Sequence, residues 1–312
     1  MVTEPIFKDW TDQTSDLFGN VPLNLRHRLH EHPLFSDDGL AGLIETCPRD
    51  NYNLVQWGTQ GPRSDWREGE IIGLSGGDVL DAIRQGRMWI NIRNLPQFST
   101  PHARLLDDIF SELEARLPSL QSFNRTMGLL ISSPKSRTLY HADLPGQSLW
   151  QLRGVKRVYL YPKAAPFLKE EELEKIALTG VEVSLGYESW FDGHAQAFDI
   201  KPGDMMTWPH NMPHRVDNHD VLNVSMTLEW FTPDIRRTHM VTMANAILRH
   251  KLGFAPKSRD IHGASFWAKA VLQKAFRKTS WIRRESRARK PATFRPDPHQ
   301  PDGIIELAGT RA

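Results

Sequence analysis

The chain has 312 residues, of which 39% are hydrophobic, enough to fill the core of one large domain or two small ones. Its 39 Lys and Arg nearly balance 37 Asp and Glu, so nucleic acid is not the partner that we expect. The single cysteine, Cys47, excludes an internal disulfide and favours a reducing compartment, which predicts a cytoplasmic protein. No stretch approaches about 18 uncharged apolar residues, and we expect no membrane insertion.

The first part of the chain, residues 1–84, mixes Pro, Asp, Asn and Gly with short apolar patches and predicts an irregular arm packed on the core. Helices are predicted over residues 36–47 and 76–86, where apolar residues recur at helical spacing. The alternation of apolar and polar residues over 88–95 is typical of a strand.

Residues 85–235 predict the core of the protein, because their short segments are rich in β-branched and aromatic residues and are separated by Pro and Gly. Such spacing suits a β-sandwich or barrel. The expected strands lie at residues 127–133, 148–154, 156–162, 195–204, 205–210 and 221–231. A charged helix is predicted between two of them, over residues 167–180, on the outside of the barrel.

The end of the chain, residues 236–282, predicts helices, and residues 283–312 predict a loose tail that is basic and rich in Pro. In the second helix an apolar stripe must be buried, either against the chain's own barrel or in a homodimer. The stripe consists of Ala264, Trp267, Ala268, Val271, Leu272, Ala275 and Phe276. The basic run over residues 274–290 reads as a solvated helix end, with phosphate or acidic-protein binding as the alternative.

Two histidines and an aspartate are the strongest chemical signal. His141 and Asp143 stand at the end of a strand pattern, and positions two apart on a strand share a face. His214 follows much later, after a Pro-Gly-Asp turn and a short apolar strand. Two His and one carboxylate on one face of Fe(II) leave positions open for a bidentate co-substrate and dioxygen. A structural His beside an unrelated Asp is the alternative.

These residues resemble the jumonji-type cupin-like hydroxylases, a family of Fe(II)- and 2-oxoglutarate-dependent oxygenases that includes factor-inhibiting-HIF-like and bacterial cupin-like proteins. The resemblance covers about residues 85–232 and implies a double-stranded β-helix (cupin, or jelly-roll) core, with an N-terminal arm and C-terminal helices. It also implies that Lys156, thirteen residues after Asp143, and Thr138, three before His141, hold the distal carboxylate of 2-oxoglutarate.

A buried carboxylate needs a cation and a hydroxyl donor, which Lys156 and Thr138 supply. The alternative for Lys156 is an edge-strand lysine that points into water. Gln147 stands where the family often has Asn, in contact with co-substrate or substrate. His210 is the alternative to His214 as ligand, and we prefer His214 because the family's ligand usually follows a Pro.

The prediction is a dioxygenase that hydroxylates a small molecule or peptide, or demethylates it through hydroxylation. Its rivals are a metal-binding cupin without 2-oxoglutarate chemistry and a non-enzymatic regulatory protein. Tryptophans and two polar residues near the site are weaker candidates for substrate contacts, since most tryptophans fill cores. These residues are Trp150, Trp208, Trp230, Arg215 and Asn223.

Overall fold

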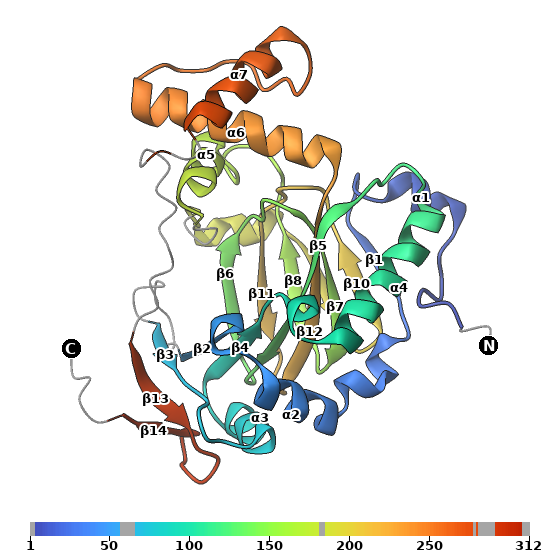
Figure 1. Ribbon diagram of the computed structural model, residues 1–312, viewed down its shortest axis with the longest axis vertical. Coiled ribbons are helices and arrows are strands. Elements are labelled where there is room, and N and C mark those ends of the chain that lie inside the picture. The colour runs from blue at the N-terminus through green and yellow to red at the C-terminus, as the bar shows by residue number, and fades with distance from the viewer. Residues whose placement is uncertain (1–3, 57–65, 181–184, 277–278, 280–290, 308–312) are drawn as a thin grey trace.

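The structure is a computed structural model, and it describes residues 4–56, 66–180, 185–276, 279 and 291–307. Two facing β-sheets form its centre, with helices on the outside (Figure 1). The helices are α1 (Asp12–Leu17), α2 (Asp37–Thr46), α3 (Gly76–Gln85), α4 (Thr100–Arg116), α5 (Glu170–Thr179), α6 (Pro233–Leu252) and α7 (Gly263–Phe276).

Most of the strand residues lie between residues 120 and 232. They are β1 (Leu23–Arg26), β2 (Tyr52–Gln56), β3 (Arg67–Gly69), β4 (Met88–Ile92), β5 (Phe123–Ser132), β6 (Arg137–His141), β7 (Gly146–Arg153), β8 (Lys156–Leu160), β9 (Gln196–Ile200), β10 (Asp204–Thr207), β11 (His214–Asn218), β12 (Asn223–Phe231), β13 (Ala292–Pro296) and β14 (Ile304–Glu306).

A ten-stranded sheet runs in the order β1-β10-β7-β12-β5-β4-β2-β3-β13-β14, and it faces a four-stranded sheet in the order β6-β11-β8-β9. All neighbouring strands pair antiparallel except β3 and β13, which run parallel. Consecutive strands alternate between the two sheets, from β5 to β6 to β7 to β8. This is the double-stranded β-helix core that the sequence predicts, and that prediction is confirmed.

The interior contains two apolar layers, one between the large sheet and the helices and one between the two sheets. The large sheet packs its outer face against α2, α3 and α4, through a continuous core that includes Leu40, Ile83 and Ile109. The inner faces of the two sheets meet in a smaller cluster, which includes Val158 and Met206. Burial of this apolar surface holds the sheets face to face.

Helix ends follow local signals in the sequence. The Ser36 side chain accepts a hydrogen bond from the Gly39 N–H and caps α2, and Thr232 caps α6 in the same way, with Pro233 at the first helical position. Helix α6 ends at Gly253, whose φ of 73° is a left-handed conformation that glycine adopts without strain. Helix α4, over residues 100–116, has no counterpart among the helices predicted from the sequence.

The two ends of the chain are more ordered than the sequence predicts. The expected arm, residues 1–84, contributes β1, β2 and β3 to the large sheet. The expected loose tail contributes β13 and β14, and Phe294 of β13 is fully buried against the sheet. The sequence did not predict these strands, because they are short and largely polar and their few apolar residues become buried only when the sheet forms. The division at residues 84, 235 and 282 remains a prediction.

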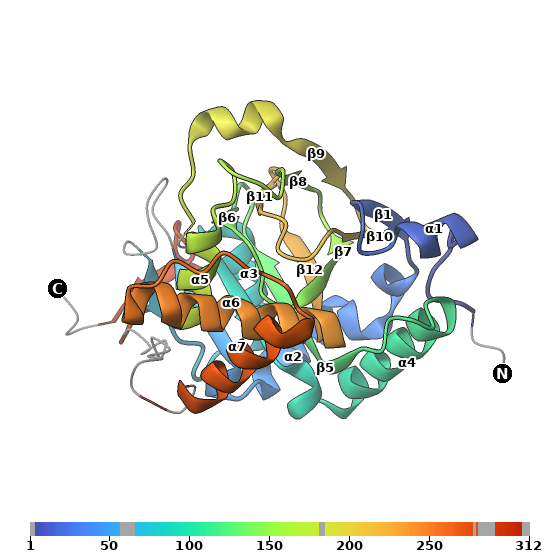
Figure 2. The same cartoon turned by 90° about the horizontal axis from the view of Figure 1, so that it is seen from above.

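The apolar stripe of the last helix is not buried against the barrel. Helix α7 packs on α6 through Phe266 and Ala270, whereas Trp267 and Val271 are 64% and 67% exposed. Figure 2 shows α6 and α7 side by side at the periphery of the molecule. The expectation of packing against the barrel is therefore wrong, because α6 stands between α7 and the sheets. Within the described residues, no helix has the length and apolar character needed to cross a membrane.

Candidate metal centre

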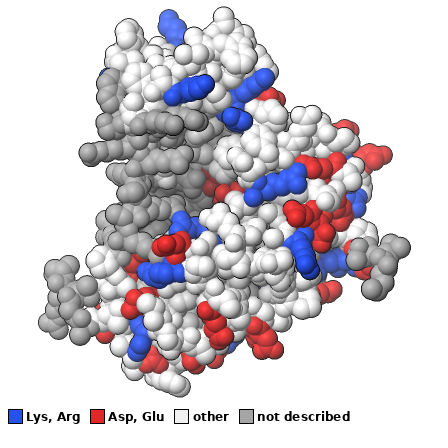
Figure 3. Space-filling model, in the orientation of Figure 1, with Lys and Arg blue, Asp and Glu red and all other residues white. Residues whose placement is uncertain are grey.

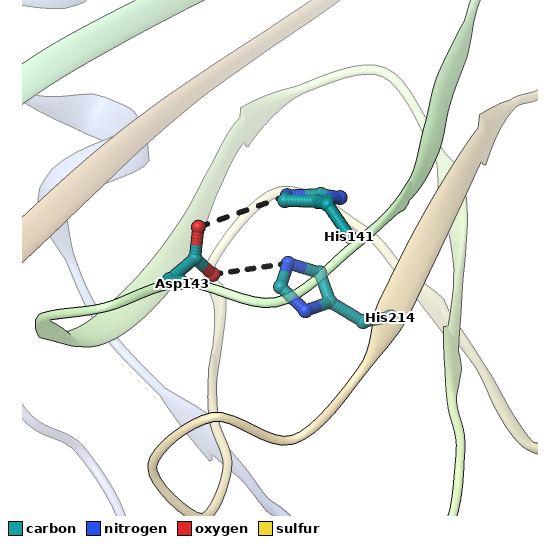
Figure 4. A group of neighbouring side chains, drawn as sticks. All are labelled: His141, Asp143 and His214. Atoms are coloured by element: carbon teal, nitrogen blue, oxygen red, sulfur yellow. Dashed lines mark ion pairs between the residues drawn. The ribbon is translucent and has the colours of Figure 1, made fainter. Parts of the chain in front are cut away.

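The three predicted metal-binding residues lie at one end of the small sheet. His141 is the last residue of β6, and His214 is the first residue of β11. The two histidines are direct partners across the antiparallel pair. The spacing predicts that Asp143 lies on the same strand as His141. Instead, Asp143 lies in the connection between β6 and β7, and its carboxylate points back toward both imidazoles (Figure 4).

The strand register places the predicted co-substrate residues on the same inner face. In the β6–β11 pair, His214 faces His141 and Val216 faces Thr138, so β6 has one extra residue between two partners that are two apart on β11. Such a bulge turns Thr138 onto the face of His141, because directly opposed residues share a face. On the other side of β11, Lys156 pairs with Asn218 and shares this face by alternation.

The donor atoms of the site converge. One oxygen of Asp143 lies 3.3 Å from Nε2 of His214, and the other lies 3.8 Å from Nε2 of His141. All three ligand atoms lie within 4.8 Å of one another. Within the described part of the chain, no other group of three His, Cys, Asp or Glu meets this criterion.

Both histidines are held in one tautomer. Nδ1 of His141 lies 2.7 Å from the carbonyl oxygen of Leu139, and Nδ1 of His214 lies 3.1 Å from that of Met212. A carbonyl oxygen only accepts hydrogen bonds, so each Nδ1 carries the proton and donates it. The Nε2 lone pairs are left to point at the Asp143 carboxylate. This is the arrangement in which imidazoles bind metal ions.

The carboxylate of Asp143 is buried without full compensation. Its Oδ2 atom is inaccessible and has no hydrogen-bond partner within the described residues. Burial raises the pKa of Asp143, while the nearby His141 and a hydrogen bond from Gln147 act to lower it. Burial also lowers the pKa of His214 well below its usual value, which keeps this imidazole neutral. A cation among the three side chains would offset the cost of the buried carboxylate.

Gln147, at the start of β7, closes the site from the large sheet. Its amide nitrogen lies 3.3 Å from Nε2 of His214, and the same side chain hydrogen-bonds Asp143. The residue therefore touches two of the three metal-binding side chains. Its direct partner on the neighbouring strand β12 is Glu229, which is half-buried on the same face.

Lys156 does not point into water, as the alternative from the sequence requires. It is 4% exposed, and the described residues provide no hydrogen bond or ion pair to its ammonium group. Burial lowers the pKa of Lys156 to about 7. An ammonium group that is buried on the inner face and has no ion pair within the described residues would be stabilised by an anion beside it.

The weaker sequence candidates fall into different places. Trp150 and Trp230 fill the main core, whereas Trp208 packs on the His214 ring at a centroid distance of 4.6 Å. Arg215 lies on the outer face and forms ion pairs with Asp192 and Asp217. Asn223 is buried and accepts a hydrogen bond from Gln151.

His210 is not among the three converging side chains. Its Nε2 lies 2.7 Å from the Leu144 carbonyl oxygen, next to Asp143 in sequence. The adjacent Asn211 donates a hydrogen bond from Nδ2 to the carbonyl oxygen of Asp143 itself, at 2.6 Å. Sequence reasoning missed Asn211, because only the fold brings residues 143 and 211 together.

Comparison with known proteins agrees with this architecture. The family model described as a cupin-like domain matches residues 88–237. The X-ray structure of Escherichia coli YcfD gives a TM-score of 0.52 at 16% identity, covering 89% of this chain and 71% of that one. A structure described as YcfD, a ribosomal oxygenase from Escherichia coli, in complex with cobalt and 2-oxoglutarate gives a TM-score of 0.48 at 14% identity, covering 93% and 75%.

No curated protein sequence matches this chain. At 16% identity, the likeness to YcfD shows a shared fold, and the three converging side chains lie inside the segment that the family model matches. The match to the family model of the cupin-like domain covers residues 88–237, which is 150 of the 312 residues of this chain.

Proposed function

We propose that this protein is an Fe(II)- and 2-oxoglutarate-dependent dioxygenase that hydroxylates its substrate, or demethylates it through hydroxylation. His141, Asp143 and His214 would bind the iron. The observation that carries the proposal is the convergence of two Nε2 lone pairs on a buried carboxylate whose Oδ2 has no partner within the described chain. Two His and one carboxylate are the ligand set of non-haem iron oxygenases.

The second half of the proposal concerns 2-oxoglutarate. Lys156 would bind its distal carboxylate, and the Thr138 hydroxyl would donate a hydrogen bond to it. Both residues lie on the inner face that carries the histidines, as the register of β6, β11 and β8 requires. Val158, Leu160 and Val216 belong to a buried apolar cluster between the two sheets, and apolar surroundings would strengthen the attraction between the ammonium group and an anion.

When bound, iron and 2-oxoglutarate supply the oxidising chemistry, in which dioxygen is reduced as 2-oxoglutarate becomes succinate and carbon dioxide. The chain itself binds, orients and excludes water. Leu139 and Met212 fix the imidazole tautomers through their carbonyl groups. Gln147 and Glu229 place polar groups beside the site, so we propose a polar small molecule or peptide as the substrate.

We also propose that α7 mediates homodimerisation. Trp267 and Val271 are exposed one helical turn apart, and this face carries no acidic residue. A two-fold symmetric interface places a surface against its own copy, and Trp267 and Val271 of both copies would be buried there, with Lys274 as the one charged residue on this side of the helix. Elsewhere on the face shown in Figure 3, acidic and basic side chains intermingle.

Light scattering should give a dimer for the wild type and a monomer for Trp267→Glu. A wild-type monomer would refute this part.

The enzymatic proposal is tested by succinate release and oxygen uptake in anaerobically iron-loaded protein supplied with 2-oxoglutarate. Turnover without substrate should vanish in His141→Ala and should require much more 2-oxoglutarate in Lys156→Ala. Arg157→Ala is the matched control, since Arg157 neighbours Lys156 but is exposed and pairs with Asp199. Iron binding without any effect of 2-oxoglutarate would instead favour a metal-binding cupin.

A further inference from the structure

The connection between β10 and β11, residues 208–213, contacts both sides of the candidate metal centre. It precedes His214 directly and supplies the Met212 carbonyl that accepts a hydrogen bond from Nδ1 of His214. The Trp208 ring packs against the His214 ring. The same six residues also reach across to the segment that carries Asp143.

The backbone around Asp143 is not held by strand pairing, although the side chains of Ala142 and Leu144 pack in an apolar cluster. Strand β6 ends at His141 and β7 begins at Gly146, so residues 142–145 are outside both sheets. Their carbonyl groups therefore need partners from elsewhere. Two consecutive carbonyls find them in the 208–213 connection: His210 donates to Leu144 O at 2.7 Å, and Asn211 donates to Asp143 O at 2.6 Å.

Both donors are held rigidly. His210 is largely buried and has its Nε2 hydrogen directed at the carbonyl of Leu144, and burial lowers its pKa to about 4, so the ring is neutral at ordinary pH. Asn211 has a φ of 61°, in the left-handed region that asparagine tolerates better than most residues. Its backbone is fixed further by the Met212 N–H, which donates to Pro209 O at 3.0 Å.

We infer that His210 and Asn211 are positioning residues that set the metal affinity of the site by fixing the backbone of Asp143 relative to His214. This inference rests on the proposed metal-binding function. His210, a candidate ligand from the sequence, acts through the Leu144 carbonyl and not on the metal. The two side chains thereby connect the segment of Asp143 to the segment that leads into His214.

The test is a titration of the metal-free full-length protein with Co(II), followed by the visible absorption of the bound ion. His210→Phe removes the donor and keeps a ring in the same space, whereas His210→Gln keeps an amide donor. Asn211→Gly removes the side chain and still tolerates the left-handed backbone. His102→Phe is the matched control, because His102 is also a histidine removed from solvent but lies in the core beside Phe35.

The Kd for Co(II) should rise about 10- to 100-fold in His210→Phe and Asn211→Gly, the range typical of residues that orient metal ligands. His210→Gln should return to within about 3-fold of the wild type, and His102→Phe should match it. Wild-type Co(II) affinity in both His210→Phe and Asn211→Gly would overturn the inference, and so would a loss that His210→Gln fails to restore. If His210→Phe fails to fold, Asn211→Gly decides alone. A wild type that binds no Co(II) would refute the metal-binding proposal itself.

Discussion

The two faces of the small sheet differ in how their buried charges are paired. On the outer face, Arg215 packs over the Tyr159 ring and is held by Asp192 and Asp217. Burial acts to lower the pKa of Arg215, but the hydrogen bonds that its guanidinium donates to both carboxylates raise the pKa above the usual value. On the inner face, Lys156 and Asp143 have no ion partner of opposite charge other than histidine within the described residues.

This difference separates structure from function. The charges of the outer network are paired, although Oδ1 of Asp217 has no hydrogen-bond partner within the described residues, and Arg215 and Tyr161 connect the segment around Asp192 to the sheet. On the inner face, Lys156 and Asp143 are not fully paired with opposite charges within the described residues, and their burial costs stability unless a ligand compensates for it. Breaking each network should therefore have opposite consequences for stability and for ligand binding.

The largest effect is expected for Lys156→Met. Removal of a buried charge that pairs with the 2-oxoglutarate carboxylate should weaken 2-oxoglutarate binding by about 100-fold or more. The apo protein should be as stable as the wild type or more so, because an unpaired buried cation is replaced by an apolar side chain. Calorimetric titration of the metal-loaded protein and urea unfolding of the apo protein measure the two effects. Destabilisation with unchanged binding would contradict the comparison.

Arg215→Met should show the reverse pattern. Loss of the guanidinium leaves Asp192 and Asp217 partly buried without their cation, and we expect a loss of about 2 kcal/mol in the free energy of unfolding. Co(II) and 2-oxoglutarate affinities of the folded protein should stay within about 3-fold, because Arg215 lies on the opposite face of β11. Urea unfolding followed by Trp fluorescence provides the stability measurement. A change in ligand affinity larger than that in Lys156→Met would show that the two faces are not independent.

Binding of 2-oxoglutarate should weaken at alkaline pH. Burial lowers the pKa of Lys156 to about 7, and only the protonated ammonium group attracts the anion. Above that pKa the free protein must take up a proton before it binds, so the Kd should rise about tenfold per pH unit between pH 7.5 and 9. In Lys156→Met this slope should disappear. A Kd independent of pH in the wild type would show that Lys156 stays charged in the free protein.

The smallest expected effect is the contribution of the buried, neutral His102 to the pH dependence of stability. Burial lowers the pKa of His102 to about 4, and the residue is 2% exposed. The unfolded chain takes up a proton near pH 6.5 and the folded chain does not, so stability falls as the pH falls through that range. Between pH 7 and 6 the loss should be about 0.7 kcal/mol. The pH dependence of urea unfolding should be shallower by this amount in His102→Phe.

Part of the fold could be read from local patterns. Strands such as β5, β7 and β12 carry dense β-branched and aromatic residues, and α2 and α3 carry helical periodicity with serine caps, so their positions were predicted. Strands β1, β3 and β13 were not, because short polar segments become strands only when a sheet edge supplies their hydrogen bonds. The Trp267 face of α7 was expected to be covered by the barrel, but periodicity does not reveal that α6 occupies that position.

For the site, the sequence by itself determined the donor types and their spacing: His141, Asp143 and His214, with Lys156 and Thr138 at intervals that resemble a known family. Only the tertiary structure decided which atoms converge, because an antiparallel pairing joins residues 141 and 214 and a bulge turns Thr138 to their face. It also excluded His210 from the converging set and gave it the Leu144 carbonyl as a partner. Contacts between segments far apart in the chain leave no local pattern, so the sequence names the chemical groups and the fold sets their geometry.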